Sequence, residues 1–367
     1  MKYFTYIGEG LRLFKRSLVV KKKGTKRYEG NSQEICIQII EDCWNERFFQ
    51  TSAGHFSVFY IRDLSFYVEQ LISLGHTERL KKSYAYAIEI YRKHNKITTT
   101  INPKGIPIDI YTYSIDSLPL FLRSLRLLNA TKIIDEYKDY LENEIKKFYK
   151  IVIDKKTGLV KKDKQFSSAK DHSKRKSSMY DNVMAWILQQ ECDNLNLINP
   201  LKNIGYKKLL KEKFWTGNYF LDDLSREKYI SGDANTIPYW AGLYDDKKMI
   251  KKSIESIQKA GLDSPFPLKY TNKEIKNHYH NILGILASNY EGNAIWMQWG
   301  LLYLEVVKMV DKKLLNKYLQ IYSNLIEKHG NYLEVFNPDG SIYSSPIYYC
   351  DESMIWCAGY LGLMKKK

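Results

Sequence analysis

Carboxylate, amide and aromatic side chains gather in this chain where polar segments lead into apolar ones. Asp181 is the clearest case, because it stands in the apolar run 178–186 and follows the polar segment 161–177. From this local pattern alone, Asp181 is either a helix N-cap, a position that favours Asp, or an active-site carboxyl. The same residue types recur along the chain as His55, Arg62 and Asp63; Asp109, Tyr111, Tyr113 and Asp116; Asp171, His172 and Asn182; Asp233 and Asn235; Tyr290, Glu291, Asn293 and Trp296; and Glu334, Tyr348, Tyr349, Asp351 and Glu352.

This mixture of side chains suits a sugar. Aromatic faces pack against the C–H faces of a sugar ring, and carboxylates accept hydrogen bonds from its hydroxyl groups. Two carboxyl groups on opposite sides of a glycosidic bond can hydrolyse it. The residues therefore predict a carbohydrate substrate.

Several of these residues also have a purely structural interpretation. Arg62 and Asp63 lie inside an apolar segment and could form a buried ion pair. Asp233 could simply cap a helix, and Trp296 could belong to the core. These alternatives stay open at the level of the sequence.

The spacing of apolar residues predicts twelve helices after residue 30. Six are apolar on nearly all sides, at 57–74, 112–128, 179–191, 233–243, 291–310 and 348–363. They alternate with helices at 32–46, 77–94, 132–149, 200–212, 246–260 and 312–329, most of which have one charged face. Asn31 with Glu34 predicts a capping box, and Thr77, Asp245 and Asp311 are expected to cap later helices.

This alternation predicts an all-α fold. A helix that is apolar all round is buried, whereas an amphipathic helix faces water. Six buried helices alternating with six surface helices are typical of an α/α six-hairpin toroid, with short β excursions in its loops. We expect residues 1–30 to form a poorly regular N-terminal arm and residues 31–367 to form the toroidal catalytic domain. A helical solenoid is the rival fold, but no shared repeat motif is present.

Composition excludes several classes of protein. The net charge is +16 over 367 residues, but the excess Lys is spread along the chain and no nucleic-acid-binding motif stands out, so a nucleic-acid partner is not expected. The five Cys have no CxxC spacing, and the pair His278 and His280 lacks a third ligand nearby, so neither a metal nor a cofactor is predicted. No apolar run is long enough to span a membrane. These features predict a cytoplasmic protein with buried thiols; they leave its oligomeric state open.

Four segments resemble the six-hairpin glycosidases, the group that contains trehalases, processing α-glucosidases and mannosylglycerate hydrolases. They are GHFSVFYIRDLSF at 54–66, SSMYDNVMAW at 177–186, YEGNAIWMQWG at 290–300 and NYLEVFNPDGS at 331–341. The resemblance runs from about Phe49 to the end of the chain. Two departures are visible: Arg62 stands where the family often has an aromatic residue, and Ser-Met-Tyr replaces the family's Ser-Gly-aromatic lead into the acid.

The resemblance implies roles for individual residues. Asp181 matches the family's general acid and Glu334 its general base. Asp171 is a second candidate for the acid and Glu291 for the base. The implied substrate-binding residues are Arg62, Asp63, Asp116, Asp171, Asn182, Asp233, Glu291 and Trp296.

The expected reaction is inverting hydrolysis of an α-glucoside or a related small saccharide. We expect a Met- and Trp-lined pocket to raise the pKa of Asp181 by desolvation. A sugar epimerase on the same fold would use His55, His172 or His280 instead. A phosphorylase would use the basic and Ser-rich segment 174–178. A non-catalytic scaffold that binds carbohydrate or RNA is the remaining alternative.

Overall fold

The computed structural model describes residues 2–110, 112–272, 287 and 289–365. Tyr111, His278 and His280 lie outside the described residues. The helices are α1 (Lys2–Lys23), α2 (Ser32–Asp42), α3 (Ile61–Ser65), α4 (Val68–Ser73), α5 (Thr77–Lys93), α6 (Ser117–Leu127), α7 (Thr131–Glu136), α8 (Lys138–Val152), α9 (Met179–Asn194), α10 (Tyr206–Phe214), α11 (Ile237–Trp240), α12 (Lys247–Lys259), α14 (Met297–Lys308), α15 (Lys312–His329) and α16 (Cys357–Lys365).

The strands are short and lie in the connections. β1 (Phe59–Tyr60), β2 (Thr100–Ile101) and β3 (Pro107–Ile108) form one antiparallel sheet, with Phe59 opposite Ile101 and Ile101 opposite Pro107. β4 (Ile295–Trp296) pairs antiparallel with β5 (Val335–Phe336), so that Trp296 lies opposite Val335. The predicted all-helical character, with β excursions between helices, is confirmed.

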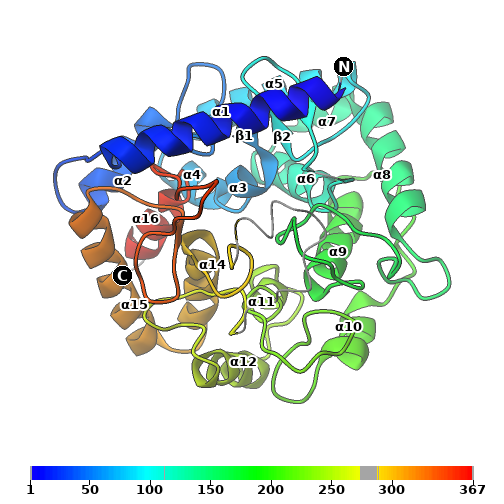
Figure 1. Ribbon diagram of the computed structural model, residues 1–367. Coiled ribbons are helices and arrows are strands. Elements are labelled where there is room, and N and C mark those ends of the chain that lie inside the picture. The colour runs from blue at the N-terminus through cyan, green and yellow to red at the C-terminus, as the bar shows by residue number, and fades with distance from the viewer. Residues whose placement is uncertain (1, 111, 273–286, 288, 366–367) are drawn as a thin grey trace.

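The buried helices contact one another in a closed order. α3 contacts α6, α6 contacts α9, α9 contacts α11, α11 contacts α14, α14 contacts α16, and α16 contacts α4, which follows α3 in the chain. The amphipathic helices α8, α10, α12 and α15 lie around the outside of this ring (Figure 1). α14 is buried at every residue from Met297 to Leu304, whereas α15 buries one face through Leu315, Tyr318, Leu319, Tyr322 and Ile326. The ring therefore carries the core between its helices and leaves their leading ends to meet at one side.

Helix ends that rest on local chemistry form as predicted. Asn31 and Glu34 make the expected capping box. The Asp311 side chain accepts the backbone N–H of Leu314, and Gly330 ends α15 with φ of 58°, a left-handed conformation that suits glycine. The expected cap at Asp245 is wrong by one residue, because Asp246 accepts the N–H groups of Lys248 and Met249.

The first 30 residues correct the predicted irregular arm. They contain α1, which lies across the top of the molecule in the view of Figure 1. Arg12 donates to the Ser57 hydroxyl at 3.2 Å, and the Ser17 hydroxyl accepts the N–H of Tyr349 at 2.5 Å. These contacts explain why a strongly basic segment is a regular helix, since tertiary packing supplies most of a helix's stability.

Other predicted helices begin later or break. The segment 57–74 pairs as β1 before splitting into α3 and α4, and 132–149 splits into α7 and α8. The segments 112–128, 233–243 and 348–363 become helical only at Ser117, Ile237 and Cys357. Thr77 is not a cap, because the N-cap position belongs to His76, which makes no side-chain capping bond. Pro119 lies in the first turn of α6, where its missing N–H costs no hydrogen bond.

The predicted burial of the thiols is confirmed, because all five Cys are buried and free. Within the described ranges, no helix combines the length and apolarity that crossing a bilayer would require.

Replacing Gly300 by Ala should destabilise the fold strongly. A β-carbon there would overlap the Tyr322 hydroxyl and would stand 2.5 Å from the carbonyl oxygen of Pro267, which that hydroxyl donates to at 2.8 Å. Overpacking of this kind costs about 1–3 kcal/mol, and we expect a value at the upper end because backbone blocks the space. Urea denaturation measures the loss, with Gly8→Ala as a control because nothing lies within 4 Å of its added β-carbon. Equal stability of the two variants would contradict the prediction.

Candidate active site

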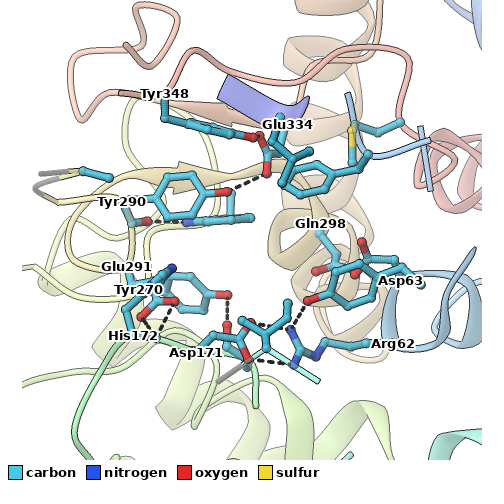
Figure 2. Close-up of a pocket in the computed structure, with 18 of the residues that line it drawn as sticks. Arg62, Asp63, Asp171, His172, Tyr270, Tyr290, Glu291, Gln298, Glu334 and Tyr348 are labelled. Atoms are coloured by element: carbon cyan, nitrogen blue, oxygen red, sulfur yellow. Dashed lines mark hydrogen bonds and ion pairs between the residues drawn. The ribbon is translucent and has the colours of Figure 1, made fainter. Parts of the chain in front are cut away.

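A cavity of about 470 Å³ opens beside the leading ends of α3, α14 and α16. Its wall combines acids with many aromatic rings (Figure 2). The predicted residues that line it are Arg62, Asp63, Asp171, Glu291, Trp296 and Glu334, joined by Phe14, Phe56, Tyr60, His172, Tyr270, Tyr290, Gln298, Tyr348, Met354 and Trp356. The expectation that carboxylates and aromatics converge on one cleft therefore holds for these residues.

Glu334 is held at the cavity by hydrogen bonds to both carboxylate oxygens. It directly precedes β5, and its backbone oxygen accepts the N–H of Met297 at 3.1 Å. Tyr290 donates to Oε1 at 2.7 Å, while Tyr348 and the N–H of Asp351 donate to Oε2 at 2.5 Å and 3.0 Å. Burial, and then the nearby Asp351, raise the pKa of Glu334 to about 6. The carboxylate is therefore fixed in orientation and ionised at neutral pH.

Asp63 projects from α3 into the same cavity (Figure 2). Its Oδ1 accepts a hydrogen bond from Gln298 Nε2 at 2.9 Å. Burial raises the pKa of Asp63 to about 7, although the neighbouring Arg62 opposes the rise; Glu334 and Asp171 add to it. Asp63 is therefore a carboxyl group that can hold a proton near neutral pH.

Arg62 also lines the cavity, and its guanidinium group joins two loops. It donates to Asp116 Oδ2 at 2.5 Å and to both oxygens of Asp171 at 3.2 and 3.3 Å. Asp116 also accepts the hydroxyl of Tyr180 at 2.9 Å and does not line the cavity. The predicted substrate contact at Asp116 therefore has no geometric support. Arg62 does form buried ion pairs, but its partners are Asp116 and Asp171 and not Asp63.

Glu291 anchors the loop that carries Asp171. Its two oxygens accept the N–H of His172 at 3.0 and 2.9 Å, and Oε2 accepts the Ser173 hydroxyl at 3.0 Å. Burial raises the pKa of Glu291, and His172 opposes the rise. These hydrogen bonds tie Glu291 to the loop that carries Asp171.

Asp181 does not line the cavity. The N-cap of α9 is Ser178, whose hydroxyl accepts the N–H of Asp181 at 3.0 Å, so Asp181 is not the cap either. Burial raises the pKa of Asp181 to about 6 against the opposing charge of Arg175. The pKa of Asp181 is thus shifted in the expected direction, but its side chain is not one of those that line the cavity.

Asn182 and Asp233 also lie away from the cavity. The Asn182 amide donates to the carbonyl of Ser178 at 2.7 Å and accepts the N–H of Val160 at 3.0 Å, which ties the loop before α9 to α9 itself. Asp233 pairs with Lys170 at 2.9 Å and Arg175 at 3.0 Å. Both residues therefore stabilise the polar loops. The ion pairs of Asp233 could not be predicted, because the spacing of residues in the sequence does not reveal its distant partners.

Sequence reasoning missed the contribution of α1 to the site. Gly10, Leu13 and Phe14 line the cavity. The spacing of apolar residues in this segment is misleading, because Leu11 and Leu18, which share a helix face with Phe14, are exposed and do not line the cavity. Gln298 was also missed, because an amide inside an apolar helix carries no local sign of its partner.

Neither a family model nor a curated protein matches the chain, but several solved structures superpose on it. A glycosidase variant in complex with glucose aligns with a TM-score of 0.65 at 10% identity, over 98% of each chain. A GH63 mannosylglycerate hydrolase from Thermus thermophilus aligns with a TM-score of 0.58 at 9% identity, over 92% of this chain and 100% of that one. A rhamnosidase from Klebsiella oxytoca, with rhamnose bound, gives 0.63 at 9% identity over 94% of this chain and 66% of that one.

The chain has the fold of these glycosidases. The predicted resemblance to the six-hairpin glycosidases is thereby confirmed at the level of the fold. At 9–10% identity the shared fold does not transfer an activity. The argument for a function therefore has to come from the carboxylates that line the cavity.

Proposed function

We propose that the protein is a glycoside hydrolase built on an α/α six-hairpin toroid, and that it inverts the anomeric centre of its substrate. The closed order of contacts among the buried helices supports the toroid. The observation that carries the function is that Asp63 and Glu334, two carboxyl groups in different electrostatic environments, line one aromatic cavity. Acid and base catalysis of hydrolysis requires two carboxyl groups whose surroundings give them different pKa values.

Glu334 is the proposed base. Its oxygens accept three hydrogen bonds, from Tyr290, Tyr348 and the N–H of Asp351, and such bonds favour the charged form of a carboxyl group. In the inverting reaction an ionised carboxylate takes a proton from the attacking water while the second carboxyl protonates the leaving oxygen. Position and ionisation of Glu334 both fit the first of these tasks.

Asp63 is the proposed acid, in place of Asp181. A general acid must reach the glycosidic oxygen and must carry a proton at the operating pH. Asp63 lines the cavity and its pKa is raised to about 7. Asp181 has a raised pKa but does not reach the cavity, and Asp171 reaches it but is engaged at both oxygens by Arg62.

The substrate is proposed to be an α-glucoside or a related small saccharide. The cavity volume of about 470 Å³ lies within the range of pockets that enclose small ligands, roughly 300–1,000 Å³. Trp296 supplies an aromatic face, and its indole N–H is held by the carbonyl of Tyr290 at 2.6 Å. The pair Arg62 and Asp171 supplies charged partners for hydroxyl groups. The glycosidase variant named above as a complex with glucose supports a hexose.

A screen of saccharides tests this proposal. We expect release of glucose, mannose, galactose or rhamnose from at least one di- or oligosaccharide, at a rate that does not depend on phosphate. Proton NMR during the first minutes should show the product anomer opposite to that of the substrate. Formation of a sugar phosphate would indicate a phosphorylase, and absence of any release would remove the proposal. The phosphorylase is not favoured, because no residue of segment 174–178 lines the cavity.

An epimerase is the second candidate, and it rests on His172, which lines the cavity. Epimerisation would exchange a carbon-bound hydrogen of a free sugar with solvent. Incubation of free hexoses in D₂O, followed by NMR, should show no deuterium incorporation if the protein is the proposed hydrolase.

A further inference from the structure

A buried histidine lies directly behind the proposed base. His55 is 0% exposed, and its Nδ1 lies 3.0 Å from Asp351 Oδ1. Its Nε2 lies 3.2 Å from the hydroxyl of Tyr348, which donates to Glu334 Oε2 at 2.5 Å. Four side chains thus form a row from the interior to the cavity, in the order Asp351, His55, Tyr348 and Glu334.

Hydrogen bonds from the surrounding loop stabilise the ionised form of Asp351. Its carboxylate accepts the N–H groups of His55 at 2.7 Å and Phe56 at 3.0 Å, and the hydroxyl of Ser52 at 2.5 Å. A β-carbon at Gly54 would overlap this carboxylate, so the loop closes around it only with glycine at that position. Burial alone would raise the pKa of Asp351, but His55 and these hydrogen bonds lower it.

Counting protons along the row fixes the state of His55. Tyr348 has one hydroxyl proton, and its short bond to Glu334 uses that proton. The Tyr348 oxygen can then only accept from His55, which requires a proton on Nε2. Nδ1 lies 3.0 Å from Asp351 Oδ1, an ion-pair contact without hydrogen-bond geometry, and this anion favours a proton on that nitrogen too. Both ring nitrogens carry protons only in the imidazolium ion.

The charges around His55 agree with this count. Burial is the largest single effect on His55 and opposes its positive charge, but the combined effects of Asp351 and Glu334 exceed it and the pKa of His55 is raised. Glu334 contributes in the same direction, while Arg16 of α1 opposes it. Tyr348 and Glu352 are further titratable groups near the ring: the pKa of Tyr348 lies well above its usual value because the phenol is buried and next to Glu334, and burial raises the pKa of Glu352 while His55 opposes that rise.

We propose that the ion pair of His55 and Asp351 acts through Tyr348 to keep Glu334 ionised and correctly oriented, and so determines the pH range in which Glu334 works. This inference rests on the proposed role of Glu334 as base. When His55 is an imidazolium, Tyr348 can donate only to Glu334. When His55 loses its Nε2 proton, that nitrogen becomes an acceptor and draws the Tyr348 hydroxyl away from Glu334. His55 and Asp351 are positioning residues, since neither lines the cavity.

Kinetic pH profiles test the proposal. The substrate is the glycosyl fluoride of the sugar identified by the screen, because fluoride leaves without protonation and the profile then omits the acid. In His55→Gln, an uncharged amide can still donate to Tyr348. Loss of the positive charge should raise the acidic limb of kcat/KM, which reports Glu334, by about one pH unit. We expect kcat to fall about tenfold while KM changes less than twofold.

Asp351→Asn should move the opposite limb. The neutral amide no longer stabilises the imidazolium, so the alkaline limb, which reports His55, should shift to lower pH by about one unit or more. His94→Gln is the matched control, because His94 is exposed at the end of α5, and its profile should coincide with that of the unmodified protein. Unchanged limbs in both His55→Gln and Asp351→Asn would overturn the proposal.

A measurement without substrate separates this inference from the proposed function. Histidine labelled with ¹³C at Cε1 gives one NMR signal per imidazole, and His55→Gln identifies the signal of His55. That signal should titrate above the ordinary histidine pKa of about 6.5. It should titrate at lower pH in both Asp351→Asn and Glu334→Gln, because each variant removes an anion that stabilises the imidazolium. If His55 is neutral in the unmodified protein, the inference is overturned even if the protein hydrolyses glycosides. If His55 is cationic and coupled to Glu334 but the protein hydrolyses nothing, only the proposed function is overturned.

Discussion

Glu334→Gln should abolish turnover while leaving the fold intact. The amide keeps the shape of the side chain and can still accept from Tyr290 or Tyr348, but it cannot take a proton from water. General base catalysis contributes about 10²–10⁴-fold, and we expect kcat to fall by at least that much. Single-turnover kinetics on the identified saccharide measure the loss, and an unchanged melting temperature shows that the fold is retained.

The loss at Glu334 should be the same on every substrate. A glycosyl fluoride does not need its leaving group protonated, yet its hydrolysis still needs an activated water. Glu334→Gln should therefore stay inactive on the fluoride. Glu212→Gln, on the exposed face of α10, is the control and should retain full activity. Near-normal hydrolysis by Glu334→Gln would move the role of base to Glu291.

Asp63→Asn should show the opposite dependence on the leaving group. On a natural glycoside the variant cannot protonate the departing oxygen, and kcat should fall by about 10²–10⁴-fold. On the glycosyl fluoride most of the activity should return. In the unmodified protein, activity on a natural glycoside should decline as pH rises through about 7, because Asp63 then loses its proton. On the fluoride, Asp63 should not contribute to the alkaline limb, which should report His55 alone.

Two further carboxyl variants test whether the general acid is Asp63 or another residue. Asp171→Asn should raise KM on both substrates, because it breaks the bidentate contact with Arg62 at the cavity. Asp181→Asn should lower stability, because it leaves the buried charge of Arg175 with one fewer anion nearby. Neither should recover selectively on the fluoride. Selective recovery of Asp171→Asn or Asp181→Asn would transfer the role of acid to that residue.

The parts of this molecule that depend on local chemistry could be predicted from the sequence. The capping box at Asn31 is determined within a few residues, as is the start of α15 at Asp311 and its end at Gly330. The alternation of buried and amphipathic helices could also be predicted, because the pattern of apolar residues indicates how much of each helix is exposed to water. Asp63, Glu291 and Glu334 were correctly expected at one cavity, since each stands where a connection meets a buried helix or strand.

What could not be predicted depends on partners that are distant in the chain. Asp181 and Asp63 look alike in sequence, since both lie in apolar helical segments. They differ because Arg175 and the surrounding polar loop lie beside Asp181, whereas the cavity opens beside Asp63. The position of α1 depends in the same way on contacts with Ser57 and Tyr349, which lie 45 and 332 residues away from their partners in the sequence.

The closed order of helix contacts has a consequence for biosynthesis. The ring is completed where α16 packs on α2 and α4, and the same region brings His55 to Asp351. A ribosome must therefore have translated the chain through α16 before these segments can meet. Early helices that emerge from the exit tunnel expose apolar faces whose partners do not yet exist, which is the situation in which chains aggregate or recruit chaperones. The candidate site, including the charge next to Tyr348, can thus form only after α16 has emerged. A nascent chain stalled before α16 would present most of the helices of the ring without the complete pocket.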